Sequence, residues 1–441
     1  MKIAFTTLGC RTNQHDSAEM QTLLEQEGFS IVPSGEEADV YVINTCTVTQ
    51  KSDHNSRLAV KKSLAINESA LVVFTGCYAQ TRPSEAMDIP GMDLVLGNAD
   101  KLEIATVLKR RLDLPNGRLK TSTPLLHMSD INSRRDFKTI PVSRFQGRTK
   151  AFIKVQTGCA EQCSFCTVVR ARGRSISDSR ANILNNVKQT IAAGFKEITL
   201  SGINLGTYGM DASPPETFSS LVADILKLNG DFRVRLSSIN PMEIDDDLLK
   251  LIADADNLCP HLHIPLQSGD DAILARMRRN YNSGQYVDVI ERAVSRIPNL
   301  GLGADVIVGF PGETDAMFEN TRRMIEDLPF SYLHVFSYSP RKGTEAYDFK
   351  DEIPKADKKS RNKILTELAK NKALEFRKRF LGATVPVLLE NQRDSSSGML
   401  KGHSEQYIPV TVAGDDSLMN RLVPVTIQEV SEHQVSGCVQ S

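Results

Sequence analysis

The chain has 441 residues and a formal net charge of −1, with 40% hydrophobic and 24% charged residues. It is longer than one hydrophobic core normally spans, so we expect two or three globular domains. The sequence has no run of about eighteen apolar residues and starts without a secretory signal, which predicts a cytoplasmic protein with no membrane span. In that reducing compartment, the eight cysteines favour metal binding or catalysis over disulfides.

Residues 1–115 are predicted to form an α/β domain with a parallel sheet. Apolar runs at residues 2–6, 40–44 and 71–75 alternate with helical stretches at residues 17–27 and 52–64. This alternation is typical of parallel strands covered by helices on both faces. Each strand is followed within a few residues by a cysteine, namely Cys10, Cys46 and Cys77. Because the carboxyl ends of parallel strands meet at one edge, three loops can bring these cysteines together.

Two stretches of the chain are strongly basic. Residues 116–148 are polar and are predicted to be a basic linker, beginning at a Pro-Asn-Gly turn signal. Residues 101–150 carry twelve Lys and Arg against four Asp and Glu, and residues 355–379 carry ten against three. Such runs are explained equally well by a solvated helix face and by contact with phosphate groups.

The central part, residues 149–375, is predicted to form a partial (β/α)6 barrel. Six strand candidates separated by amphipathic stretches lie at residues 151–156, 197–201, 233–237, 262–265, 303–308 and 332–336. In such barrels the chemistry takes place at the carboxyl ends of the strands.

The tail, residues 379–441, is predicted to form a small all-β barrel. It has strand-like runs at residues 385–390, 407–412 and 422–430, with turn residues between them. It carries four basic and seven acidic residues, whereas a phosphate-binding module should be basic.

The strongest local signal is a group of three cysteines, Cys159, Cys163 and Cys166, after the first barrel strand. Three thiolates this close together can hold three corners of a cubane iron–sulfur cluster and leave one iron open. The alternative is a zinc site completed by a remote histidine or cysteine, because structural zinc normally takes four ligands.

The C-x₃-C-x₂-C spacing, with Phe165 before the last cysteine, resembles the radical S-adenosylmethionine (SAM) superfamily. The resemblance implies a [4Fe-4S] cluster on these cysteines and SAM bound to its open iron. Val168 and Val169 depart from the residues usual after the third cysteine. Segments similar to the superfamily's SAM contacts follow three of the strands, and they supply the remaining candidate cofactor-binding residues: Gly202, Asn204, Ser237, Ser238, Ile307 and Gly309.

The contexts of Cys10, Cys46 and Cys77, which are LGCRTNQ, NTCTVT and TGCYAQ, are similar to the three cluster loops of the methylthiotransferase family. The resemblance covers nearly the whole chain and implies a second [4Fe-4S] cluster that carries sulfur. It also implies a TRAM-like RNA-binding tail, a tRNA substrate and an external electron donor such as a flavodoxin. No side chain is assigned a catalytic role, because the radical chemistry belongs to the clusters and SAM.

Among the family's branches, LGCRTNQ, NTCTVT and the segment at residues 334–345 look most like the threonylcarbamoyladenosine tRNA branch. The alternatives are the isopentenyladenosine branch, the branch acting on a ribosomal-protein aspartate and, remotely, a zinc-binding RNA module without catalysis. With the tail acidic, the basic runs together with Arg170, Arg172, Arg174 and Arg180 are the better candidates for phosphate contacts. His261 and His263 could form a metal pair, but hydrogen-bonded core positions are favoured. Cys259 and Cys438 are expected to be structural.

Overall fold

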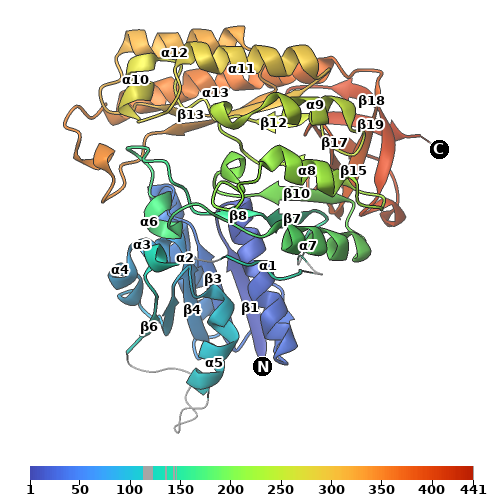
Figure 1. The fold of residues 1–441 in the computed structure, drawn as a ribbon. Helices are drawn as coiled ribbons and strands as arrows, with labels where there is room; N and C mark the ends of the chain where they lie inside the picture. Colours follow the sequence, from blue (N-terminus) through green and yellow to red (C-terminus); the bar gives the residue numbers. More distant parts are fainter. Residues whose placement is uncertain (113–122, 135–136, 143–144, 146, 441) are drawn as a thin grey trace.

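The computed structural model describes residues 1–112, 123–134, 137–142, 145 and 147–440, which fold into three connected parts (Figure 1). An N-terminal sheet with its helices lies below a half-open array of strands and helices, and a small barrel closes one end of that array (Figure 1). No helix in the described part of the chain is long and apolar enough to cross a membrane.

The N-terminal part is a six-stranded, all-parallel sheet. Its order is β2 (Ser30–Val32), β1 (Lys2–Thr7), β3 (Val40–Thr45), β4 (Leu71–Gly76), β5 (Leu94–Leu96) and β6 (Leu125–His127). Its helices are α1 (Arg11–Gln26), α2 (Gln50–Ile66), α3 (Cys77–Thr81), α4 (Pro83–Met87) and α5 (Ile104–Leu112). Helices α1 and α5 pack on one face, and α2, α3 and α4 pack on the other.

The predicted parallel sheet is confirmed, but it also contains β2, β5 and β6, which were not predicted. Helix α1 begins at Arg11 rather than residue 17, because its first turns bury the polar side chains of Thr12, Asn13 and Asp16 and so lack an apolar period. Within the predicted linker at residues 116–148, strand β6 pairs with β5 and extends the sheet. The other linker residues include 116–122, 135–136, 143–144 and 146, which lie outside the described residues.

The central part contains the six predicted strands, all parallel to their neighbours. They are β7 (Ala151–Lys154), β10 (Glu197–Ser201), β11 (Arg233–Leu236), β12 (His261–His263), β13 (Gly301–Val308) and β14 (Tyr332–Ser337). They form two sheets of three, which are joined where Val234 bridges to Leu258 and the Ile239 amide donates to the His263 carbonyl at 3.0 Å. Alternate apolar side chains of these strands form one core with the surrounding helices.

The helices of the central part cover the outer face of the strand array, except for α6 (Val168–Arg172), which packs against α3 of the N-terminal part (Figure 1). The others are α7 (Arg180–Ala192), α8 (Phe218–Leu226), α9 (Asp246–Asp254), α10 (Asp271–Arg276), α11 (Ser283–Arg296), α12 (Asp315–Asp327) and α13 (Lys355–Lys378). A short antiparallel pair, β8 (Gln156–Thr157) with β9 (Ile176–Ser177), flanks the segment that carries Cys159, Cys163 and Cys166. The strands therefore present their carboxyl ends toward this segment and the N-terminal sheet (Figure 1).

The C-terminal part is a closed barrel of five strands. They are β15 (Thr384–Arg393), β16 (Leu400–Ser404), β17 (Pro409–Val412), β18 (Leu422–Val430) and β19 (Val435–Val439). Strands β16 and β19 were not predicted, because glycine and polar residues interrupt both sequences. Buried Arg235 attaches the barrel to the central part, donating to the carbonyls of Glu405 at 2.7 Å and Ser404 at 2.9 Å.

Candidate active site

The three N-terminal cysteines lie at one edge of the sheet, directly after neighbouring strands. Cys10 caps α1 after β1, Cys46 follows β3, and Cys77 begins α3 after β4. Their loops are tied together by Asn13, whose side-chain amide donates to the Leu8 carbonyl at 2.7 Å and the Thr45 carbonyl at 2.9 Å. Strand order β1-β3-β4 thus converts distant sequence positions into one local group.

The approach of these three loops is close enough to require glycine. A Cβ at Gly9 would lie 2.7 Å from the Cys46 Cβ, and one at Gly76 would lie 2.5 Å from the Thr45 carbonyl oxygen. Both glycines have φ near +100°, a backbone region that other residues rarely adopt. Burial raises the pKa of the Cys46 thiol to about 11, and the neighbouring thiol of Cys77 raises it further. Three thiols brought to one edge of the sheet, of which Cys46 is buried and Cys10 is exposed, are a donor set that suits iron, because bound iron supplies the positive charge that three thiolates need.

The second trio, Cys159, Cys163 and Cys166, lies on a loop that is fixed to the end of α10 through Ser164, whose amide donates to the Met277 carbonyl at 3.1 Å. The Cys159 amide donates to the Gly173 carbonyl at 3.1 Å, and the Cys166 amide donates to the Cys163 carbonyl at the same distance. Burial raises the pKa of Cys159 to about 11 and that of Cys166 to about 12, and the neighbouring thiols add to both shifts. The sulfur of Cys163 accepts a hydrogen bond from Arg279 at 3.3 Å.

A buried ionic network joins the two cysteine sites. Asp16 of α1 accepts from Lys101 at 2.7 Å, from Lys154 of β7 at 2.5 Å and from Arg172 of α6 at 2.9 Å. Burial opposes ionisation of Asp16, but these three cations hold its pKa well below the usual range. Arg172 lies six positions after Cys166 and also donates to the Asn13 side chain at 2.5 Å. The loop of one trio is therefore fixed directly to the loop of the other.

Four of the predicted SAM-binding residues lie at the carboxyl ends of β10 and β11. The Gln156 side-chain oxygen accepts from the Ile203 amide at 2.9 Å and the Asn204 amide at 3.0 Å, which fixes the segment beginning at Gly202. Within the described chain, the buried Asn204 Nδ2 and Ser237 Oγ have no hydrogen-bond partner. Ser238 is hydrogen-bonded to His263 Nδ1 at 2.7 Å. Unpaired buried polar atoms at this edge suit a polar ligand such as SAM.

The other predicted SAM-binding residues lie across the same opening. Phe165 and Ile307 share a small apolar cluster, and the Phe165 ring packs edge-on against Phe310 with centroids 6.3 Å apart. Gly309 follows β13 with φ +68° and donates its amide to Glu313 at 2.7 Å. The structure therefore places all seven predicted residues around the carboxyl edge of the barrel.

The segment after β14 contacts both cysteine-bearing loops. Ser339 Oγ accepts from the Gln50 amide at 3.2 Å, and Arg341 donates to Thr47, the residue after Cys46, at 2.8 Å. The Ala346 amide donates to the Ser164 carbonyl at 2.8 Å. In the sequence this segment was only a mark of the threonylcarbamoyladenosine branch; its contacts with the two loops could not be predicted, because its partners lie far away along the chain.

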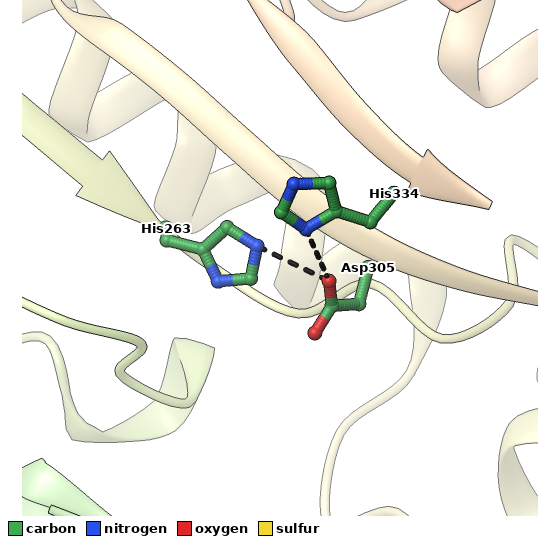
Figure 2. Close-up of side chains that lie close together, drawn as sticks. All are labelled: His263, Asp305 and His334. Carbon is green, nitrogen blue, oxygen red and sulfur yellow. Dashed lines mark hydrogen bonds and ion pairs between the residues drawn. The ribbon is translucent and has the colours of Figure 1, made fainter. Parts of the chain in front are cut away.

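Three side chains from neighbouring strands meet in the barrel lumen: His263 of β12, Asp305 of β13 and His334 of β14 (Figure 2). One oxygen of Asp305 lies 3.3 Å from His263 Nε2 and 3.1 Å from His334 Nδ1. Burial opposes ionisation of Asp305, but hydrogen bonds from the two histidines lower its pKa well below the usual value. His261, the other histidine of β12, is buried and hydrogen-bonded to the Tyr332 hydroxyl at 2.9 Å, so the hydrogen-bonded alternative is confirmed there.

The structure corrects one prediction about phosphate contacts. Arg172 is 5% exposed and is paired with Asp16, so the prediction that it binds phosphate is wrong. Arg180 is paired with Glu216 at 2.9 Å and with Asp224 at 2.5 Å. Its charge is therefore largely neutralised within the fold. Arg170 and Arg174 are exposed and stay candidates.

One side chain beside the cysteines, Gln156, was not recognised from the sequence as a site residue. For Arg279 the sequence indicated equally a pairing with a carboxylate of cofactor or substrate and a surface charge. Gln156 orients the segment at residues 202–204, and Arg279 contacts Cys163 and, at 2.7 Å, the Asn240 side chain. Their signal in the sequence is only that each lies just after a strand or helix that borders the site. Neither type of residue forms a recognisable motif by itself.

Family comparisons match the two cysteine-bearing parts separately. Residues 2–97 match a family described as uncharacterized protein family UPF0004, and residues 153–325 match the radical SAM superfamily. A radical SAM methyltransferase from Kitasatospora setae, solved with cobalamin and a [4Fe-4S] cluster bound, superimposes with a TM-score of 0.56 at 14% identity. The superposition covers 78% of this chain and 77% of the methyltransferase chain, so the likeness extends over most of the fold. The fold and the Cys159 loop thus define a radical SAM enzyme, a class that uses a [4Fe-4S] cluster and SAM.

Full-length relatives narrow this class. A protein named threonylcarbamoyladenosine tRNA methylthiotransferase MtaB is 34% identical in Bacillus subtilis, covering 96% of this chain and 93% of the relative. The protein of the same name from Aquifex aeolicus is 39% identical, covering 88% of this chain and 93% of the relative. A tRNA-2-methylthio-N(6)-dimethylallyladenosine synthase from Clostridium botulinum is 32% identical, covering 98% of this chain and 95% of the relative. The chain belongs to the radical SAM tRNA methylthiotransferase family.

Proposed function

We propose that this enzyme converts N6-threonylcarbamoyladenosine beside the anticodon of tRNA into its 2-methylthio derivative. The two cysteine-bearing loops meet at the junction of the N-terminal sheet and the barrel, and this arrangement is the main support for methylthiolation. The Arg172 contacts with Asn13 and Asp16 hold the two loops together. The segment after β14 contacts both loops, so one substrate base between them can reach both sites.

In this proposal Cys159, Cys163 and Cys166 hold the radical SAM cluster, and a second trio holds an auxiliary [4Fe-4S] cluster. The auxiliary ligands are Cys10, Cys46 and Cys77. When bound, these groups would supply a radical that removes hydrogen from an aromatic carbon, a sulfur that replaces it and, from a second SAM, the methyl group on that sulfur. The chain itself provides three thiolates per site; among the six cysteines Cys46 is buried, Cys10 is exposed and the other four are partly buried.

The chain's other residues position SAM rather than react with the substrate. Gln156 holds the Gly202 segment so that its backbone faces the ligand, and Asn204 and Ser237 offer polar atoms without protein partners. Arg279 donates to Cys163 and so stabilises negative charge on that sulfur. Phe165, Ser238, Ile307 and Gly309 complete the proposed contacts around the same opening. Each group contributes orientation, which converts a collision into a positioned encounter.

The choice of substrate rests on the relatives named threonylcarbamoyladenosine tRNA methylthiotransferase. The Bacillus subtilis and Aquifex aeolicus proteins are 34% and 39% identical, and the dimethylallyladenosine synthase from Clostridium botulinum is 32% identical. The difference between the two groups is modest, but it agrees with the sequence motifs around Cys10 and Cys46. We therefore infer the threonylcarbamoyl substrate rather than the dimethylallyl one.

We further infer a cytoplasmic enzyme that receives electrons from a small carrier such as a flavodoxin. Its C-terminal barrel has the size and strand number of a TRAM-like module. Because that module is acidic overall, the exposed Arg170 and Arg174 are our proposed phosphate contacts.

Nucleoside mass spectrometry of tRNA from cells with and without the gene tests the proposed function. We expect 2-methylthio-N6-threonylcarbamoyladenosine to disappear on deletion, while its unmethylthiolated precursor accumulates. Loss of the methylthiolated dimethylallyladenosine instead would assign the enzyme to the other branch. A nucleoside profile that is the same in cells with and without the gene would overturn the proposal.

A further inference from the structure

Side chains fill the barrel lumen at the end where its strands begin. His261 and Tyr332 stack there with ring planes 2° apart, and Tyr407 from the C-terminal barrel packs against both rings. Gly303 makes room for this layer, because a Cβ on it would lie 2.5 Å from a ring carbon of Tyr332. A ligand entering from the carboxyl edge therefore meets a closed floor.

The next layer toward the carboxyl edge is the His263–Asp305–His334 group (Figure 2). Ser238 holds His263 through Nδ1, and Asp305 holds His334 through Nδ1. With Nδ1 occupied, the Nε2 atom of His334 is the one left to contact a ligand. Exposure increases across the layer, from 8% for the His263 side chain and 28% for Asp305 to 55% for His334.

An exposed aromatic ring lies beside this histidine. Phe336 is 41% exposed, and its ring packs edge-on to His334 with centroids 6.4 Å apart. Both side chains belong to β14, two positions apart, so they share the lumen face of the strand. The same strand continues into the segment that contacts the loops of Cys46 and Cys163. An imidazole and an aromatic face are thus exposed beside both proposed clusters.

We propose that His334 and Phe336 bind the target adenosine, with His334 hydrogen-bonding the carboxylate of its N6 substituent and Phe336 packing against the base. This inference rests on the proposed function. The threonylcarbamoyl group ends in a carboxylate, which only accepts hydrogen bonds. His334 binds it as an imidazolium, with Nδ1 donating to Asp305 and Nε2 donating to the ligand. Flat bases pack well on aromatic side chains. Positions 2 and 6 belong to the same ring of adenine, so a contact at N6 orients the carbon to be modified.

The test compares three anticodon stem-loop RNAs with the cluster-reconstituted enzyme. One carries threonylcarbamoyladenosine, the second has its carboxylate converted to a carboxamide, and the third carries unmodified adenosine. For the wild type we expect a KM about ten- to a hundredfold higher for the carboxamide than for the carboxylate. His334→Leu should raise the KM for the carboxylate RNA by the same factor, with no further loss on the carboxamide. His334→Gln, which keeps a donor, should recover part of the difference.

Matched variants separate this subsite from general damage. Phe336→Leu should weaken binding of all three RNAs by a similar factor, since every base has a face to pack. His433→Leu replaces another exposed histidine, in the turn before β19, and should leave the carboxylate preference unchanged. An unchanged KM in His334→Leu, or an equal loss on the carboxylate and carboxamide RNAs, would overturn the proposal.

The His–Asp–His group also has the composition of a metal site, with its ligand atoms all within 4.8 Å of one another. Zinc and manganese are therefore quantified in the wild type and in His334→Leu. A stoichiometric metal present only in the wild type would replace direct carboxylate binding with metal binding and overturn the proposal. The wild-type arm also tests the proposed function by itself: no methylthiolation of the carboxylate RNA would overturn both, whereas methylthiolation without a carboxylate preference would overturn only the subsite.

Discussion

The substitution Asp16→Asn should destabilise the enzyme strongly, because it removes a buried carboxylate that is paired with three buried cations. The carboxylate is 3% exposed and lies 2.5 to 2.9 Å from Lys101, Lys154 and Arg172. Removing one partner of a buried ion pair costs about 3–5 kcal/mol. Glu19 still neutralises Lys154 at 2.9 Å, so we expect the lower end, about 3 kcal/mol.

Anaerobic urea unfolding at neutral pH measures this effect. The chain has no tryptophan, so far-ultraviolet circular dichroism is the suitable signal. With a slope of about 3 kcal/mol/M, the unfolding midpoint should fall by roughly 1 M. Asp254→Asn makes the same chemical change in an exposed pair, in which Lys250 and Asp254 are 75% and 60% exposed, and should not move the midpoint measurably. Equal midpoints for both variants would refute the view that the network stabilises the junction.

Cys46→Ala should lower the iron content from about eight to about four per chain, whereas Cys438→Ala should leave it unchanged, as measured by iron and sulfide analysis. Gly76→Ala should cause the same loss, because its Cβ would lie 2.5 Å from a backbone oxygen, whereas Gly28→Ala, at φ +85° with no atom within 4 Å, should not. Glu19→Gln should flatten the decline in stability between about pH 5 and pH 3, measured by urea unfolding of the cluster-free protein. Burial opposes ionisation of Glu19, but Lys154 helps to lower its pKa to about 2, so its contribution is present above about pH 4.3 and is lost as the pH falls toward 2.

Each of these expectations can fail separately. Full iron content in Cys46→Ala would remove the auxiliary cluster from the proposal, and an equal iron loss in both glycine variants would show that φ alone, rather than contact with the Thr45 backbone, limits the site. A Glu19→Gln variant with the wild-type pH dependence would show that other carboxylates carry the acid sensitivity.

Features encoded in short windows of the chain could be predicted from the amino-acid sequence. The Cys159, Cys163 and Cys166 spacing fits within eight residues, and each strand–cysteine unit of the N-terminal sheet is a local pattern. Strand–helix alternation then predicts parallel neighbours, whose carboxyl ends share an edge. For these reasons the meeting of Cys10 with two cysteines 36 and 67 positions away was predictable without coordinates.

Which side chains serve these sites and which serve the fold depends on contacts between segments that are distant in the sequence. Arg172 belongs to a basic segment, yet its partner Asp16 lies 156 positions away and draws it into the interior. His334 is oriented by its hydrogen bond with Asp305, which lies 29 positions away on the adjacent strand. A buried charge or an oriented imidazole is defined by its partners in space, and hydrophobic periodicity carries no information about such pairs.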